Sequence, residues 1–260
     1  MAGKGNPEPR GGVQSVERAL DLLELLAEAG SPQGLTQLAA ASGLPLPTIH
    51  RLMGTLTERG YVRRESARRY TLGSRLVPLA ESANKAFGAW VLPALRRVVD
   101  LTGETANLAM MEGDAVVYLA HVPSAHSMRM FTEPGRRVMA HCTGVGKALL
   151  AQMPVADVRA LLSRTGLPAQ TERTITDVDE LLEELGRIRV EGFAMDNGEQ
   201  EVGVRCIAAR VIHAPGLMAL SVSAPLVRMS EADVERIVPV VTAVAAQLGV
   251  DSAERQGVAG

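Results

Sequence analysis

Hydrophobic residues recur at helical spacing in three stretches within the first sixty positions. The stretch VQSVERALDLLELLAEAG predicts an amphipathic helix that is capped by Ser15 and ends at Gly30. A shorter helix is predicted over LTQLAAASG, and a third over LPLPTIHRLMGTLTERG, where Pro47 suits a first helical turn. Leu22 and Leu25 widen the first stripe and suggest a second contact. The expected core stripe of the first helix is Val16, Ala19, Leu20, Leu23, Leu26 and Ala27.

The third predicted helix carries a polar face opposite its apolar stripe of Ile49, Leu52, Met53 and Leu56. Two short helices joined by a tight turn that contains glycine are typical of a helix-turn-helix, whose second helix enters the DNA major groove. Arg51 can bond a guanine edge or a phosphate, and the neighbouring hydroxyl and imidazole groups can do the same less specifically. An ordinary amphipathic helix with a solvated face explains this helix alone equally well.

A basic hairpin is predicted directly after this helix. The stretch GYVRRESARRYTLG reads as strand, turn and strand, and its tip RRESARR holds four arginines. Such a hairpin is the wing of a winged helix, and its arginines can follow phosphates or enter a narrow minor groove. We therefore predict a winged helix-turn-helix over residues 13–73. Its candidate DNA contacts are Thr48, His50, Arg51, Thr55, Arg63, Arg64, Arg68 and Arg69.

The remaining chain mixes strands and helices. Residues 74–103 predict connecting helices with a restart at Pro93 and a buried Trp90. After them, NLAMMEGDAVVYLAHVP predicts a hairpin and SMRMF a further short strand. Helices are predicted over CTGVGKALLAQM, DVDELLEELGRIRVEG and SEADVERIVPVVTAVAAQLG, and strands over GVRCIAARVIH and GLMALSVSAP. Because hairpins imply an antiparallel sheet, we predict an α+β sensor-like domain over residues 104–250.

Composition and charge narrow the class of protein. A chain of 260 residues can bury two cores, and it has no apolar run of the roughly 20 residues that a membrane span needs. Residues 1–12 are predicted to be a disordered lead rather than a secretion signal, and residues 251–260 a flexible tail. Because the two cysteines form no disulfide framework, we expect a cytoplasmic protein. Residues 1–75 hold ten Lys and Arg against seven Asp and Glu, whereas the remainder is acidic, which favours nucleic-acid binding by the first part.

The second part of the chain offers a candidate anion site. The stretch CTGVGKALL opens a helix after a turn, and the free N–H groups around Gly144 and Val145 lie at the positive end of the helix dipole. The spacing excludes a phosphate-binding P-loop. Ser221 and Ser223 stand two apart on a predicted strand and therefore share one face. Ordinary strand packing is the alternative for these serines.

Histidine and cysteine residues offer two rival chemistries. Cys142 beside His141 resembles a nucleophile with its base, but adjacent residues on a strand point to opposite faces. The histidines and cysteines lack the close-pair spacing of a zinc site. We therefore expect no catalytic residue, no metal and no cofactor. An enzyme or a metal-binding sensor that uses His141, Cys142 and Cys206 remains the alternative.

Over almost its whole length the sequence resembles the IclR family of bacterial transcriptional regulators. The stretches that carry the resemblance are VQSVERALDLLELL, GLPLPTIHRLMGTLTERGYV, YTLGSRL, HCTGVGKALLA, DNGEQEVGVRCIAA and SVSAPLVRM. The resemblance implies an N-terminal winged helix, a GAF-like C-terminal domain joined to it by a helix, and a repressor that binds palindromic operator DNA as a dimer or a dimer of dimers.

The resemblance also implies a small anionic or ureide effector. The sequence looks most like the subgroup that represses allantoin and glyoxylate utilisation. Val145 departs from the frequent family pattern, which has alanine there, and it would narrow the pocket. Residues carried over from the family as effector contacts, with two methionines expected in the pocket wall, are Met128, Met130, Gly144, Val145, Asp196, Cys206, Ser221 and Ser223.

Overall fold

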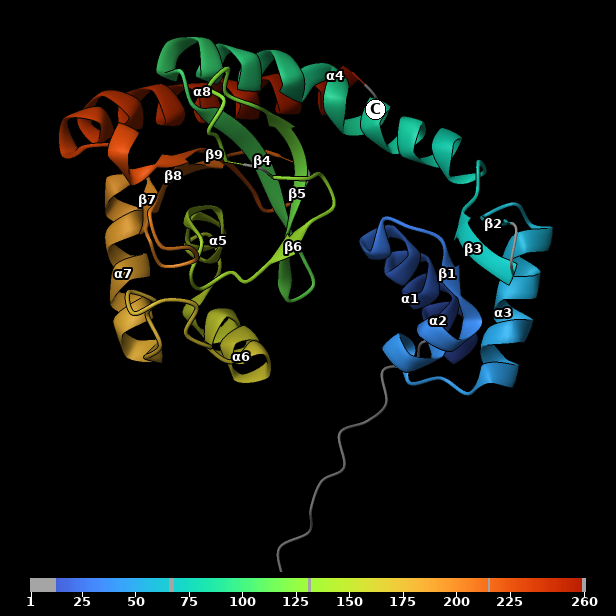
Figure 1. The fold of residues 1–260 in the computed structure, drawn as a ribbon. Helices are drawn as coiled ribbons and strands as arrows, with labels where there is room; N and C mark the ends of the chain where they lie inside the picture. The colour runs from blue at the N-terminus through green and yellow to red at the C-terminus, as the bar shows by residue number, and fades with distance from the viewer. Residues whose placement is uncertain (1–12, 66–67, 131, 215, 259–260) are drawn as a thin grey trace, which may run out of the picture. The chain divides into compact units, whose positions relative to one another are not determined.

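The computed structural model describes residues 13–258 except 66–67, 131 and 215, and it divides into two compact units between Asn84 and Lys85 (Figure 1). The division falls inside one long helix, α4 (Leu76–Thr102). The predicted lead at residues 1–12 lies outside the described residues.

The first unit is the predicted winged helix. Its three helices pack around one small core, and its strands form an antiparallel sheet in the order β1-β3-β2. Gly30 and Gly43 end the first two helices in the left-handed conformation, as the sequence predicted. Strand β1, which the sequence analysis missed, pairs with the wing. The elements are α1 (Gln14–Ala29), β1 (Gln33–Gly34), α2 (Leu35–Ser42), α3 (Leu46–Glu58), β2 (Val62–Arg64) and β3 (Arg69–Leu72).

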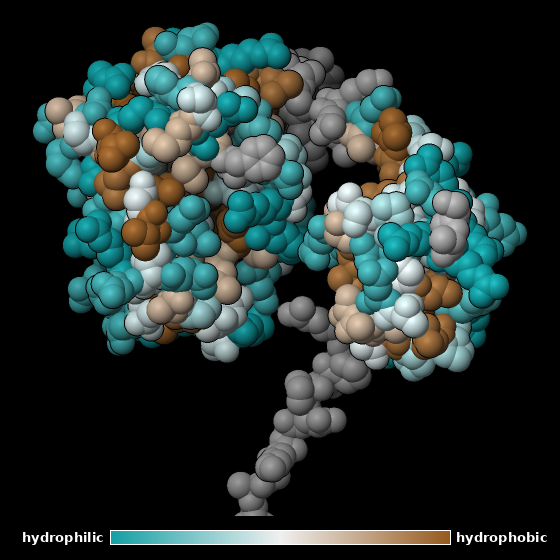
Figure 2. Space-filling view, in the orientation of Figure 1, coloured by the Kyte–Doolittle hydropathy of each residue, from teal (hydrophilic) through white to brown (hydrophobic). Residues whose placement is uncertain are grey.

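The buried face of α1 differs from the predicted one. Leu22 and Leu26 are the buried residues of this helix, whereas Val16 and Leu20 are 55% and 53% exposed. The helix begins at Gln14 without a side-chain cap, so the predicted cap at Ser15 is also wrong. Apolar residues cover so much of this helix that periodicity alone could not select the buried side. Hydrophobic side chains consequently remain on the surface of the first unit (Figure 2).

The second unit is the predicted α+β domain. It contains one antiparallel sheet in the order β6-β5-β4-β9-β8-β7. Helices α4 and α8 cover one face, and the shorter helix α5 lies on the other (Figure 1). The remaining elements are β4 (Thr105–Glu112), β5 (Ala115–Val122), β6 (Arg137–Val138), α5 (Gly144–Leu150), α6 (Val155–Thr165), α7 (Val178–Glu191), β7 (Ala194–Asn197), β8 (Val204–Val211), β9 (Met218–Pro225), η2 (Leu226–Arg228) and α8 (Glu231–Val258).

Three elements of this unit differ from the prediction. The predicted strand SMRMF does not form over residues 127–130, and the edge strand is β6 instead. Helix α4 continues through Pro93, so the predicted restart is wrong. Proline lacks a backbone N–H and removes one helical hydrogen bond, but packing of α4 against the core stabilises the helix despite this loss. Trp90 is partly buried against the domain core. Helix α8 extends to Val258, into the stretch predicted as a tail.

Candidate functional site

The outer face of α3 is the first candidate surface. Ile49 and Met53 are fully buried, which leaves His50, Arg51 and Thr55 exposed on the opposite side and Thr48 half-buried near the helix start. Gly54 lies on this exposed side, and a Cβ atom added there would meet no atom within 4 Å. The face is therefore open, and a duplex can approach the helix backbone at this glycine.

The wing presents its arginines to solvent. Arg63 forms an ion pair of 2.8 Å with Glu65, whose backbone N–H donates to the Arg69 carbonyl. Arg64, Arg68 and Arg69 are exposed, and their side chains have no hydrogen-bond or ion-pair partner within the described residues. Their guanidinium groups are thus available to phosphates, whereas the ion pair between Arg63 and Glu65 must break before Arg63 can bind one.

The second candidate site is a small cavity of about 60 Å³ in the second unit. It lies beside the sheet face that carries α5, and five of the residues predicted from the sequence line it: Met130, Gly144, Asp196, Cys206 and Ser223. The cavity is also lined by residues that the sequence did not predict, among them Tyr118, Thr132, Arg136, Gln200 and Glu201.

Strand register explains why three of these residues meet. Asp196 on β7 lies opposite Cys206 on β8, and Cys206 lies opposite Ser223 on β9. Directly opposed residues in an antiparallel sheet place their side chains on one face. The start of α5 covers this face closely, because a Cβ atom added to Gly144 would lie 3.0 Å from the Cys206 Sγ. Glycine at this position therefore lets the helix approach the sheet.

The other predicted effector contacts do not line the cavity. Val145 and Ser221 are fully buried, and Met128 is 59% exposed. Helix α5 has only seven residues, and the Thr143 hydroxyl accepts the Gly146 N–H at its start. The short helix is thus a weaker anion site than the sequence analysis expected, and Arg136 is the cationic group at the cavity.

Burial keeps the thiols of the site protonated. Burial, reinforced by Asp196, raises the pKa of Cys206 to about 11 and that of Cys142 to about 12. Burial also raises the pKa of Tyr118, so its phenol stays neutral. The pKa of Asp196 rises to about 6, mainly through burial, although its carboxylate accepts the Glu199 N–H at 2.6 Å. At neutral pH the cavity therefore offers neutral donors, the Arg136 cation, the easily protonated carboxylate of Asp196 and a second carboxylate, that of Glu201.

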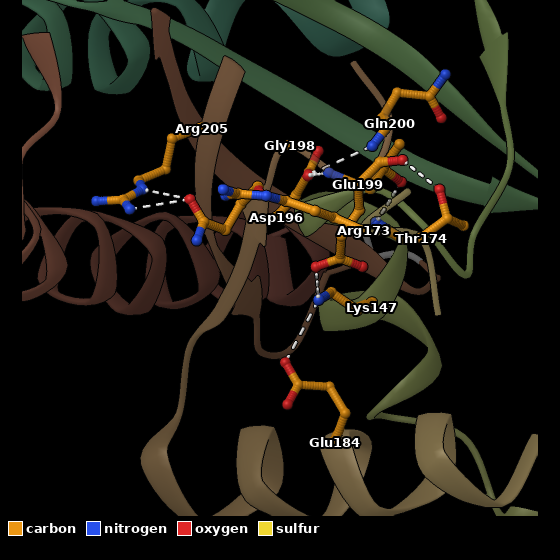
Figure 3. A network of polar contacts seen from close by, with 12 residues as sticks. Lys147, Arg173, Thr174, Glu184, Asp196, Gly198, Glu199, Gln200 and Arg205 are labelled. Atoms are coloured by element: carbon orange, nitrogen blue, oxygen red, sulfur yellow. Dashed lines mark hydrogen bonds and ion pairs between the residues drawn. The ribbon is translucent and has the colours of Figure 1, made fainter. Parts of the chain in front are cut away.

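A buried ionic network holds the loop that follows β7 (Figure 3). Lys147 points from α5 to Glu199 of this loop, with 2.5 Å between Nζ and Oε1, and to Glu184 on α7 at 3.3 Å. The Thr174 hydroxyl donates to the Glu199 carbonyl at 2.6 Å. Because Gln200 of the same loop lines the cavity, this network positions one of its walls.

The rival chemistries find little support in the geometry. The Cys142 thiol donates to Gln200 Oε1 at 3.0 Å, whereas His141 Nε2 lies 3.2 Å from the Pro168 carbonyl, so the two side chains do not bond one another. Within the described ranges no group of three His, Cys, Asp or Glu side chains could hold a metal ion. In the same ranges no helix is long and apolar enough to cross a membrane.

A winged helix joined by a long helix to an α+β domain is the architecture of a DNA-binding regulator. Residues 15–66 match the family described as IclR helix-turn-helix domain, and residues 88–250 match Bacterial transcriptional regulator IclR C-terminal. This chain therefore belongs to the IclR family of transcriptional regulators and is not an enzyme.

Individual relatives agree with this assignment. The HTH-type transcriptional regulator BhcR of Paracoccus denitrificans (strain Pd 1222) is 36% identical over 98% of this chain and 93% of the relative. The Transcriptional repressor IclR of Escherichia coli (strain K12) is 35% identical over 85% of this chain and 83% of the relative. The crystal structure of an IclR-family regulator from Alicyclobacillus acidocaldarius has a TM-score of 0.83 and 29% identity, and it covers 93% of this chain and 99% of that one.

Proposed function

We propose that this regulator is a repressor whose affinity for operator DNA is controlled by a small organic acid bound in the cavity of the second unit. The observation that carries the proposal is the small cavity at which Arg136 lies beside neutral hydroxyl and thiol groups and the carboxylates of Asp196 and Glu201. A carboxylate placed there gains a cation and several hydrogen-bond donors. Relatives that are named as repressors, among them the Transcriptional repressor IclR of Escherichia coli (strain K12), support the sign of regulation.

The size of the cavity selects among effector classes. A cavity needs at least about 10–15 Å³ to hold one water. A volume of about 60 Å³ exceeds this threshold but is small, so it favours a ligand with few non-hydrogen atoms. This favours a small acid such as glyoxylate or pyruvate over a ureide such as allantoin, which would require the cavity to open. Of the predicted compounds of allantoin and glyoxylate metabolism, glyoxylate thus remains a candidate effector and allantoin does not.

Operator binding requires two copies of the winged helix. One recognition helix reads a half-site, and a palindrome mirrors the twofold symmetry of a dimer. Exposed apolar residues Val16, Leu20, Val77 and Leu79 are 53% to 56% exposed in the first unit and offer area for such an assembly. We therefore propose a dimer, or a dimer of dimers, in the cytoplasm.

The test begins with selection of bound sequences from a pool of random DNA duplexes by the full-length protein. Affinity for a selected duplex is then measured with and without glyoxylate, pyruvate and larger acids. A palindromic selected sequence whose affinity changes with a small acid supports the proposal. Selection that enriches no sequence, or affinity that no acid alters, contradicts it.

Arg136→Gln is expected to weaken effector binding by about 1.5–3 kcal/mol, because a hydrogen bond to a charged group is lost. Arg137→Gln is the matched control, since its guanidinium donates to Glu112 Oε2 at 3.4 Å and does not line the cavity. Isothermal titration calorimetry with the effector found above gives both affinities. Equal losses in the two variants would show that Arg136 acts only through general surface charge.

Effector affinity is expected to rise as pH falls from 7.5 to 5.5. Above pH 6 the ionised Asp196 repels a bound carboxylate, and below it the protonated form does not. The increase cannot exceed about tenfold per pH unit, because one proton is taken up. The raised pKa also means that this group destabilises the fold at neutral pH and that the penalty disappears as pH falls toward 4. Asp196→Asn should remove the pH dependence of binding, and a dependence that persists in this variant would assign it to another group.

A further inference from the structure

A large apolar side chain at the start of α3 lies outside the core of the first unit. Leu46 is the first residue of α3 and is 46% exposed, and the prolines on both sides of it are exposed as well. Its neighbours Leu44 and Leu52 pack against the core, whereas Leu46 does not belong to this cluster. Core packing therefore does not explain why a leucine occupies this position.

The position of Leu46 in the helix-turn-helix gives it access to DNA. Helices α2 and α3 are joined by a turn at residues 43–45 within the stretch that matches the IclR helix-turn-helix domain. In this motif the N-terminal residues of the second helix contact base edges in the major groove. His50 is exposed one helical turn after Leu46, and side chains at this spacing lie about 5–6 Å apart. Because successive base pairs are about 3.4 Å apart, the two side chains can contact base pairs that are one or two steps apart.

The apolar character of Leu46 selects one base. A leucine side chain has no hydrogen-bond donor or acceptor, so it cannot pair with the polar groups of a base edge. The apolar group that the major groove presents is the C5-methyl group of thymine. Burial of one such group contributes about fourfold in affinity. Any other base at this position would place a polar edge against the leucine, so the first turn of α3 favours thymine.

We propose that Leu46 contacts the methyl group of one thymine in each operator half-site and determines specificity at that base pair. The inference rests on the proposed function, in which the protein binds operator DNA. Arg51 and His50 can recognise the operator through hydrogen bonds, and Leu46 adds a preference that depends on a methyl group alone. The thymine lies one or two base-pair steps from the base pair that His50 faces.

Replacement of thymine by uracil in the selected operator tests the contact, because the two bases differ only in the methyl group. Each thymine is replaced in turn, at equivalent positions of both half-sites, and the affinity of the full-length protein is measured by fluorescence anisotropy. We expect one position at which uracil weakens binding at least fourfold and 5-bromouracil restores it, since bromine is similar in size to a methyl group. If uracil has no effect at any position, the contact is overturned and operator binding stands. If the protein selects no duplex, both proposals are overturned.

A pair of variants assigns the methyl contact to its side chain. Leu46→Ala should fold, because Leu46 lies outside the core, and it should bind the thymine and uracil duplexes with equal affinity. Val155→Ala is the matched control, since Val155 is the first residue of α6, follows a proline and is also 46% exposed. We expect this control to keep the wild-type preference for thymine. A preference that survives in Leu46→Ala overturns the proposal. Light scattering in which Leu46→Ala dissociates the assembly also overturns it, because Leu46 would then be a contact between subunits.

Discussion

Replacing Lys147 by methionine is expected to lower the free energy of unfolding by about 3–5 kcal/mol, because it removes one partner of a buried ion pair. The Lys147 side chain is 1% exposed and that of Glu199 is 9% exposed, so solvent screens their interaction little. Methionine keeps the apolar length of lysine but leaves the Glu199 carboxylate without its cation. Glu199 Oε2 already lacks a hydrogen-bond partner among the described residues, which makes this loss harder to offset.

Arg187→Met provides the control. Arg187 also pairs with Glu184, but its side chain is 68% exposed, and an exposed ion pair contributes about 0–1 kcal/mol. The double variant Lys147→Met with Glu199→Gln should recover part of the lost stability, since no buried charge is then left unpaired. Urea denaturation of all three variants measures these differences. A loss below about 1 kcal/mol in Lys147→Met would mean that water reaches the network, contrary to its burial.

The same network connects stability with the cavity. Glu199 and Gln200 donate their backbone N–H groups to the Asp196 carboxylate, and Lys147 holds the Glu199 side chain. A ligand that contacts Gln200 or Asp196 therefore contacts a segment whose position depends on a buried ion pair. Ligand binding can in turn bias this segment toward one arrangement, which is the requirement for an allosteric signal.

Local patterns in the sequence predicted the elements that fold by local rules. Gly30 and Gly43 mark helix ends, Pro47 marks a helix start, and the Gly113 turn joins β4 to β5. The buried side of α1 could not be predicted, because its leucines surround much of the helix. Strands β1 and β7 have two and four residues, too few for a periodic signal. Their pairing partners, which are distant in sequence, decide whether they form.

The cavity residues that lie on neighbouring strands could be predicted from the sequence. Ser223, Cys206 and Asp196 meet because their strands are neighbours, and resemblance to the family indicated them. Arg136 and Thr132 come from an irregular segment, whose folding no sequence period describes. Lys147 lies on a helix where lysine would ordinarily indicate the solvent side, so its burial follows only from the two carboxylates that surround it.

Arg51→Ala is expected to weaken binding to the selected operator by about 1–3 kcal/mol and to relax specificity at one base pair, because the exposed face of α3 is the proposed reading surface. Arg68→Ala on the wing should behave differently. A lost phosphate contact weakens binding to every sequence alike and reduces the slope of log affinity against log salt by about 1. The two variants therefore separate base reading from phosphate contact.

Arg159→Ala is the control for both variants, because Arg159 lies on α6 in the second unit and pairs with Asp179 at 2.6 Å. Fluorescence anisotropy with the selected duplex and a scrambled duplex, at several salt concentrations, gives affinity, specificity and salt slope together. A change in Arg51→Ala that is equal on both duplexes would place this guanidinium on a phosphate. Both α3, at Gly54, and the wing, at its unpaired arginine side chains, are accessible to a duplex. If affinity is unchanged in both Arg51→Ala and Arg68→Ala, α3 and the wing are therefore not the DNA-binding surface.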